Sequence, residues 1–160
     1  MTQADVAPVP TVERFAPLVR RIARGMLRNP HDAEDAIQET LCRVVAHADQ
    51  FDGRGSLEGW VRRIAVRTSL RLLRWRRLVG LFVEDVPVPA ATGPDADTLR
   101  RLYDALDRLS ARERAAFVLR YQEELSFADA AAAMNVRETT ARGYAFRAVE
   151  KLRRLMEDAR

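Results

Sequence analysis

The sequence predicts an all-α protein with two small helical domains joined by a flexible linker, the C-terminal domain containing a helix-turn-helix. Apolar residues recur every three or four positions through most of the 160 residues, and no segment alternates as a strand would. One stretch without lysine or arginine and with three prolines interrupts this period. These observations place the domains at residues 12–79 and 99–160, with the linker at 80–98.

The first helix of the N-terminal domain is predicted over residues 12–27, where the apolar positions share one face. Asn29-Pro30 ends it, because a residue that precedes proline avoids the helical region. Asp32 is expected to cap a second helix, whose first turn carries acidic residues that suit the positive end of the helix dipole. The apolar residues along this helix are Ala36, Ile37, Leu41, Val44 and Val45.

A loop over residues 51–59 leads into a third, long helix that ends near Val79. On a helical wheel, one side of this helix is mostly apolar and the other is basic. The apolar side consists of Val61, Ile64, Ala65, Thr68, Leu72, Trp75 and Val79. The basic side consists of Arg63, Arg67, Arg71, Arg74 and Arg77.

The helical period resumes at Thr98, in the C-terminal domain. Two capping boxes, which begin at Ser110 and Ser126, then mark helix starts. A short helix over residues 127–133, a turn over 134–137 and a longer helix over 138–156 follow. This order is that of a helix-turn-helix.

Composition excludes several classes of protein. The net charge is +4, and nearly all of the basic residues are arginine. This preference for arginine over lysine reflects either a GC-rich genome or selection for phosphate and base contacts. The single cysteine, Cys42, excludes an internal disulfide, and no Cys or His set has zinc-ligand spacing, so we expect neither metal nor other cofactor. No secretion leader and no apolar run of about 20 residues is present, so we expect a soluble, cytoplasmic protein without membrane insertion.

The basic side of the third helix predicts contact with a polyanion, because its arginines repel one another until phosphates neutralise them. The alternative is a solvated charged face. Phe51 and Trp60 lie near the edge of this basic side, where a ring can stack on an unpaired base of single-stranded DNA. Core packing is the alternative for both rings.

The second helix carries the opposite charge near its start. Asp35 and Glu39 lie one turn apart on one face, which favours a protein-docking surface over ordinary helix-terminal charge. Catalysis or metal binding is disfavoured, because no nucleophile, metal-ligand motif or phosphate-binding loop accompanies the pair. We therefore expect a binding protein and not an enzyme.

The final helix carries polar or large residues of the kind that read a DNA major groove, chiefly in its first turns. These are Thr139, Thr140, Arg142, Tyr144 and Arg147, and they are expected to bind duplex DNA.

Two sets of residues resemble the extracytoplasmic-function (ECF) sigma factors of bacterial RNA polymerase. Region 2 of that family is similar to Asp32-Ala-Glu-Asp-Ala-Ile-Gln-Glu-Thr40, Phe51-Asp-Gly-Arg-Gly-Ser-Leu-Glu-Gly-Trp60 and Arg63-Ile-Ala65. Region 4 is similar to Leu109-Ser-Ala-Arg-Glu-Arg114, Leu119-Arg-Tyr121, Leu125-Ser126 and the final helix through Arg147-Ala148 and Lys151-Leu152.

The resemblance implies an alternative sigma factor that binds core RNA polymerase and directs promoter-specific transcription initiation. The residues at its polymerase-docking positions are Asp35, Gln38, Glu39 and Arg43. It also implies that region 2 opens and reads the proximal (−10) promoter element, with the loop from Arg54 to Ser56, Trp60, Arg63 and Arg67 against the melted strand. Region 4 would read the distal (−35) element, and an anti-sigma factor is an expected partner, on the exposed apolar and basic faces.

The sequence departs from the family at several of these positions. Arg67 stands where the family usually has asparagine, and Gly143, Tyr144, Phe146 and Val149 replace residues that are commonly Ser, Arg, His and Arg. The alternative function is a polymerase-independent helix-turn-helix regulator. That reading leaves the acidic second helix unexplained.

Overall fold

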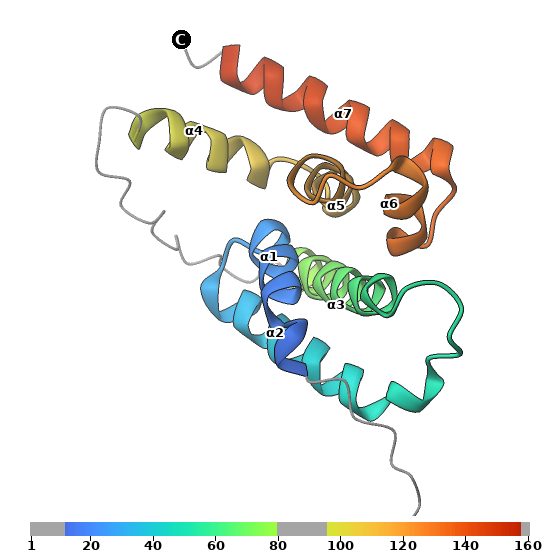
Figure 1. Cartoon of the computed structure of the whole chain (residues 1–160). Coiled ribbons are helices and arrows are strands. Elements are labelled where there is room, and N and C mark those ends of the chain that lie inside the picture. The colour runs from blue at the N-terminus through green and yellow to red at the C-terminus, as the bar shows by residue number, and fades with distance from the viewer. Residues whose placement is uncertain (1–11, 80–95, 158–160) are drawn as a thin grey trace, which may run out of the picture.

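The structure is a computed structural model that describes residues 12–79 and 96–157, and their regular elements are all helical. The helices are α1 (Ala16–Met26), α2 (Pro30–Ala46), α3 (Leu57–Val79), α4 (Ala96–Asp107), α5 (Ala111–Phe117), α6 (Phe127–Met134) and α7 (Glu138–Glu157) (Figure 1). Short turns of helix lie at Val12–Arg14 and Ala48–Gln50, and Val118–Gln122 extends α5 as a π-helical turn, η3. The predicted all-α class is confirmed, while residues 80–95 of the predicted linker lie outside the described residues.

The N-terminal unit consists of α1, α2 and α3, each of which packs on the other two. Aliphatic side chains from all three helices form its core, because each helix presents an apolar face to its neighbours. The largest that are almost wholly buried are Ile22, Met26, Val19, Val44, Val61 and Val66.

The start of α2 differs from the prediction. Asn29, and not Asp32, caps this helix: its side-chain oxygen accepts hydrogen bonds from the N–H groups of His31 (2.8 Å) and Asp32 (3.3 Å). Pro30 occupies the first helical position, where its missing N–H costs nothing. The predicted cap at Asp32 was therefore wrong, and this buried carboxylate instead forms an ion pair with Arg76 of α3.

The C-terminal unit contains α4, α5, α6 and α7, with α5 and α7 in the most extensive contact. The helix-turn-helix is confirmed as α6 and α7, and Asn135 takes the left-handed conformation (φ 55°) at the end of α6. Both bonds of the predicted capping box are present, because Ser110 Oγ accepts from the N–H of Glu113 and Glu113 accepts from the N–H of Ser110. At the second box, Ser126 caps α6 by accepting from the N–H of Asp129 (3.0 Å).

Glu113 connects α5 to α7 through a buried carboxylate. Lys151 Nζ donates to both of its oxygens, at 2.7 and 3.0 Å, and Arg147 Nε lies 3.7 Å away. Burial by itself raises the pKa of Glu113, but the hydrogen bonds from Lys151 and Ser110 outweigh burial and hold the pKa below its ordinary value of 4.5. The ionised form of Glu113 therefore stabilises the fold.

Replacing Glu113 by Gln is expected to lower the free energy of unfolding by about 1–2 kcal/mol at neutral pH, since the charge-assisted bonds are lost while Lys151 remains partly hydrated. The contribution is present above the unfolded-state pKa and is lost as the pH falls through the lower folded-state pKa. Urea unfolding at pH 7 and at acid pH measures it. Glu150→Gln, which breaks an exposed pair with Arg153 on α7, is the control; an equal cost for both variants at pH 7 would contradict the prediction.

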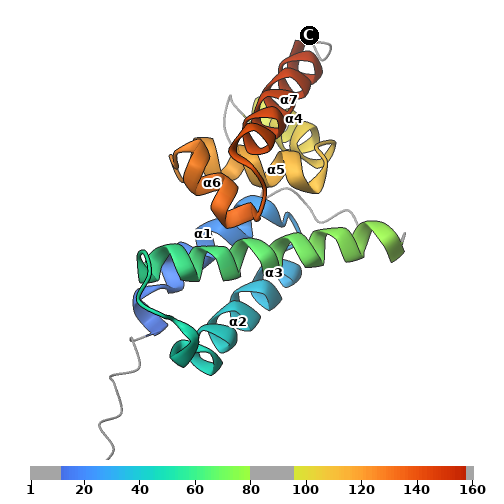
Figure 2. The ribbon, with the colours of Figure 1, turned by 90° about the vertical axis from the view of Figure 1, so that its right-hand side faces the viewer.

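The two units pack on each other, a question that the sequence left open. Helices α5 and α6 lie on α3, and one apolar core includes residues of both units (Figure 2). Helix α3 is accordingly buried on two sides, with Val66, Ser69 and Leu70 covered as well as Val61 and Ala65. The single apolar side predicted for this helix was too narrow, and Trp75, placed on that side, is 50% exposed.

Polar contacts join α1 to α5, to η3 and to Glu123, the residue that caps η3. Arg21 donates two hydrogen bonds to Glu123, at 3.1 and 3.2 Å, and the Glu123 side chain is only 2% exposed. Gln122 donates to the carbonyl of Arg21 (3.0 Å), and Arg114 donates to the carbonyl of Gly25 (3.1 Å). A Cβ atom at Gly25 would lie 2.8 Å from Gln122 Oε1 and 3.0 Å from Val118 Cγ1, so an alanine there would require the Gln122 side chain to shift.

Candidate functional site

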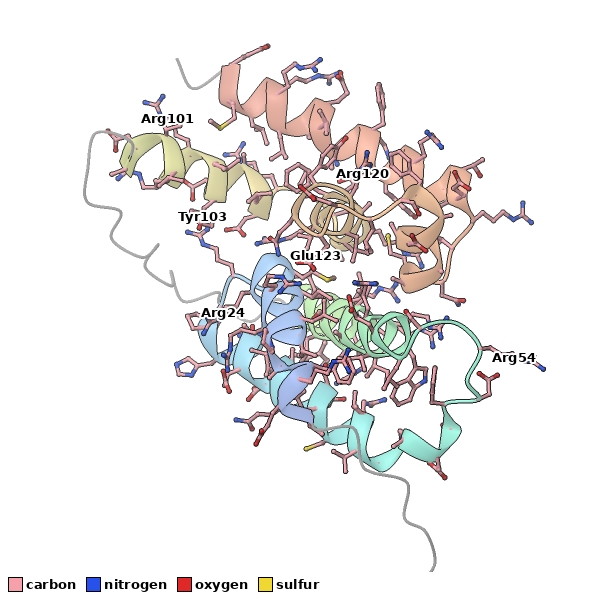
Figure 3. The ribbon with its side chains drawn as sticks, viewed as in Figure 1. Arg24, Arg54, Arg101, Tyr103, Arg120 and Glu123 are labelled. Carbon is pink, nitrogen blue, oxygen red and sulfur yellow. The ribbon has the colours of Figure 1, made fainter. Side chains whose placement is uncertain are left out.

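The loop before α3 brings the two predicted stacking residues together. The rings of Phe51 and Trp60 lie 6.0 Å apart with an interplanar angle of 53°, and both are half-buried. Gly53 and Gly55 have positive φ angles, 74° and 77°, so the loop turns where only glycine does so without strain. Arg54 stands between them and points away from the rest of the molecule (Figure 3).

Ser56 has a structural role that the sequence did not predict. Its hydroxyl oxygen accepts a hydrogen bond from the N–H of Gly59 at 2.9 Å, and its carbonyl accepts from the N–H of Trp60 at 3.1 Å. Ser56 therefore caps α3, the helix whose first turn carries Trp60.

The predicted arginines of α3 differ in their surroundings. Arg67 and Arg74 are exposed and make no salt bridge with any residue that the structure describes, and Arg63 is half-buried. Arg71 instead forms an ion pair with Glu39 of α2. The basic side thus has one acidic neighbour from another helix, and the side chain of Arg77 lies outside the described residues.

The predicted docking residues form a polar face on α2. Asp35 and Gln38 are exposed, whereas Glu39 is half-buried between Arg43 (2.9 Å) and Arg71. Because Glu39 joins α2 to α3, it connects the acidic face with the basic side of α3. Asp35 forms no ion pair within the described ranges 12–79 and 96–157, so its charge faces solvent.

The predicted DNA-reading residues lie along the first half of α7. Thr139, Arg142 and Arg147 are exposed, and Thr140 and Tyr144 are half-buried. The Tyr144 hydroxyl accepts a hydrogen bond from Arg112 (3.2 Å), so this ring braces α7 against α5 instead of projecting freely.

Phe146, which is 67% exposed on α7, is an additional candidate that was not among the predicted site residues. It lies one helical turn beyond Arg142, so it belongs to the same exposed face of α7 as that arginine. The i, i+4 spacing from Arg142 was the available signal.

Other kinds of site find no support in the described part of the chain. No three His, Cys, Asp or Glu side chains there are grouped to hold a metal ion. None of its helices combines the length and apolar character needed to cross a membrane. The features that remain are charged and aromatic surfaces suited to binding macromolecules.

Comparison with known proteins shows the family. Residues 11–78 match the family model of sigma-70 region 2, and residues 99–152 match that of sigma-70 region 4. The chain is 34% identical over 148 residues to the RNA polymerase sigma factor CarQ of Myxococcus xanthus, covering 89% of this chain and 85% of that protein. The chain belongs to the ECF sigma factors of the sigma-70 family. The predicted family resemblance is confirmed.

Further relatives and solved structures agree with this assignment. The present chain is also 32% identical over 139 residues to the ECF RNA polymerase sigma factor SigM of Mycobacterium tuberculosis H37Rv. That alignment covers 86% of this chain and 71% of SigM. The chain matches the sigma factor RpoE of Bartonella quintana, solved in complex with the anti-sigma factor NepR, with a TM-score of 0.75 and 30% identity. That match covers 93% of this chain and 96% of RpoE, so it includes both units.

Proposed function

We propose that this ECF sigma factor binds core RNA polymerase and directs promoter-specific transcription initiation as an alternative sigma factor. One observation carries the proposal: sigma regions 2 and 4 follow each other in a single chain, and each carries the surface that its role needs. Region 2 has an acidic face on α2 and a basic side on α3, and region 4 has a helix-turn-helix with exposed arginines. The protein is a DNA-binding regulator and not an enzyme.

Each unit has a separate role in this proposal. The N-terminal unit docks on polymerase through Asp35, Gln38, Glu39 and Arg43 of α2. It then holds the opened proximal element, where Phe51 and Trp60 offer half-buried rings for stacking and arginines of α3 contact the strand. The C-terminal unit reads the distal element with the exposed residues of α7.

An anti-sigma factor is a third proposed partner. RpoE was solved with NepR, and the present chain matches RpoE over both units at a TM-score of 0.75. A partner that holds the units in such an arrangement would keep this chain away from polymerase and DNA. Because core polymerase is its target, the chain acts in the cytoplasm.

The proposal is tested by measuring the affinity of the purified chain for core polymerase and then run-off transcription on a promoter library. Binding to polymerase with promoter-dependent transcripts supports a sigma factor. Specific duplex binding without polymerase affinity would instead make the chain a stand-alone helix-turn-helix regulator.

Arg67 and Arg74, which are exposed and form no ion pair with a described residue, give a sharper test of the basic side. Replacing Arg67 and Arg74 by Ala should weaken DNA binding by the holoenzyme and reduce the salt dependence of that binding. Each lost single-strand phosphate contact is expected to reduce the slope of log K against log salt by about 0.7. Fluorescence anisotropy on a forked promoter probe at several salt concentrations measures this slope.

Arg153→Ala on α7, which removes an exposed arginine paired with Glu150, is the control for net charge. If the double variant keeps the wild-type slope, α3 does not contact the DNA backbone through Arg67 and Arg74.

A further inference from the structure

Two aromatic rings of the C-terminal unit are each approached by two guanidinium groups. For Phe127, Cζ of Arg142 lies 4.4 Å from the ring centroid and Cζ of Arg120 lies 5.3 Å from it. For Tyr144, Arg147 lies at 4.9 Å and Arg112 at 6.0 Å. These distances are within the range of cation–π attraction, and the 4.4 Å contact is the shortest of the four.

The Phe127 ring connects three separate segments. Phe127 is the first residue of α6, Arg120 belongs to η3, and Arg142 belongs to α7. The ring is half-buried and packs against the apolar core, which restrains its position. The Phe127 ring thus brings the first helix of the helix-turn-helix into contact with Arg142 of the second.

Arg142 is restrained at two points while part of it stays accessible. Its guanidinium lies by the ring of Phe127 and donates to Glu138 at 3.0 Å, yet its side chain is 60% exposed. An arginine loses rotamer freedom when it binds a base or a phosphate. Restraint in the free protein lowers that loss on binding.

The second guanidinium at this ring is also restrained. Arg120 donates to the carbonyl of Leu125 at 3.4 Å while it lies near Phe127. Two like charges that share one ring repel each other, and the negative face of the ring offsets only part of this repulsion. A DNA phosphate beside them would offset the rest, so the arrangement suits an anionic partner.

We propose that Phe127 is a positioning residue for DNA recognition, whose ring holds the guanidinium of Arg142 at the DNA-reading surface of α7. This inference rests on the proposed function of region 4 in reading the distal element. Phe127 does not touch DNA in this proposal. It acts by setting the affinity and base preference that Arg142 contributes.

The test uses holoenzyme assembled from the full chain and core polymerase. The probe is the distal-element duplex that the wild-type holoenzyme enriches from a randomised library. Affinity is measured for wild type, Phe127→Leu, Arg142→Ala and the double variant, because this cycle isolates the coupling between the two side chains. Phe127→Tyr, which keeps the ring face, is the rescue variant.

We expect Arg142→Ala to weaken binding about tenfold and Phe127→Leu about fivefold, within the range for a partly exposed cation–π contact and its partner. In the Arg142→Ala background, Phe127→Leu should change affinity by less than about twofold, and Phe127→Tyr should stay within about twofold of wild type. Phe127→Leu should also relax base preference at the same position as Arg142→Ala.

Two controls separate positioning from folding. Phe117→Leu removes a half-buried ring from the same unit, one that packs against Tyr121 with the ring centroids 5.2 Å apart, and it should leave base preference unchanged. Thermal melting of each variant reports folding, and Phe127→Met replaces Phe127→Leu if the latter unfolds. An equal cost of Phe127→Leu in both backgrounds would overturn the positioning role.

The outcomes also separate this inference from the proposed function. If wild-type holoenzyme transcribes from its promoters but Arg142→Ala binds the duplex normally, the positioning role is wrong and the sigma function stands. If the wild-type chain supports no promoter-dependent transcription, the proposed function itself fails.

Discussion

Replacing Asp35 by Arg is expected to lower the affinity for core RNA polymerase by about 30- to 150-fold. Loss of one partner from a charge pair across an interface, with a like charge in its place, costs about 2–3 kcal/mol, which corresponds to that range. Asp35 suits this test because it is exposed on α2 and forms no ion pair with another described residue. Titration of labelled polymerase with each variant measures the affinity.

Glu39→Arg should give a different result from Asp35→Arg, because Glu39 also joins α2 to α3. It pairs with both Arg43 and Arg71, so reversal of its charge places three cations together. We therefore expect Glu39→Arg to lower the melting temperature as well as the polymerase affinity. Asp49→Arg, an exposed reversal outside α2, is the matched control, and equal losses for Asp35→Arg and Asp49→Arg would show a general charge effect.

The sequence predicted the helices well because the apolar period is a local signal. The helix-turn-helix and the box at Ser110 depend on residues within a few positions of one another, and the structure has both. The cap of α2 was missed although its signal was also local. Asn29 before Pro30 is the pattern of a cap followed by proline at the first helical position, and the same pair also marks the end of α1, which is all that the prediction used.

Contacts between segments that are distant in the chain could not be predicted from the sequence. The Arg71–Glu39 pair spans 32 positions and the Arg21–Glu123 pair spans 102, and no local period indicates either. The second buried side of α3 does have a signal in the sequence. Between the arginines, small and apolar residues recur at helical spacing, namely Val66, Ser69, Leu70 and Leu73. Helices α5 and α6 pack on α3 in addition to α1 and α2, which gives this helix more than one buried side.

For the candidate site, the sequence indicated which residue types could bind DNA or protein, but not which of them have partners within the fold. Arg67, Arg74, Arg142 and Asp35 are exposed as a binding role requires. Ser56 and Tyr144, by contrast, have bonding partners within the fold, and those partners depend on the loop and on α5. Roles on DNA and polymerase remain predictions for all of them.

A covalent cross-link between α1 and η3 is expected to abolish transcription from promoters that need both elements. The positions −35 and −10 differ by 25 base pairs, which is about 85 Å of duplex at about 3.4 Å per base pair. A compact chain of this length has a radius of gyration of about 15 Å and so measures about 40 Å across. Region 2 and region 4 cannot reach both elements while α5 and α6 stay on α3.

Arg21 of α1 and Glu123, which caps the end of η3, are the positions for this cross-link, because their side chains are hydrogen-bonded between the units. Both are changed to Cys in a Cys42→Ser background, which removes the single native thiol, and are joined by a cleavable bis-maleimide. Transcription should fall to the level set by the uncross-linked fraction and return when the linker is cleaved. A cross-link between Cys residues at 150 and 153 on α7 should have no such effect. Full activity of the chain cross-linked between α1 and η3 would mean that the units read the promoter while docked, and that their contact is part of the active form.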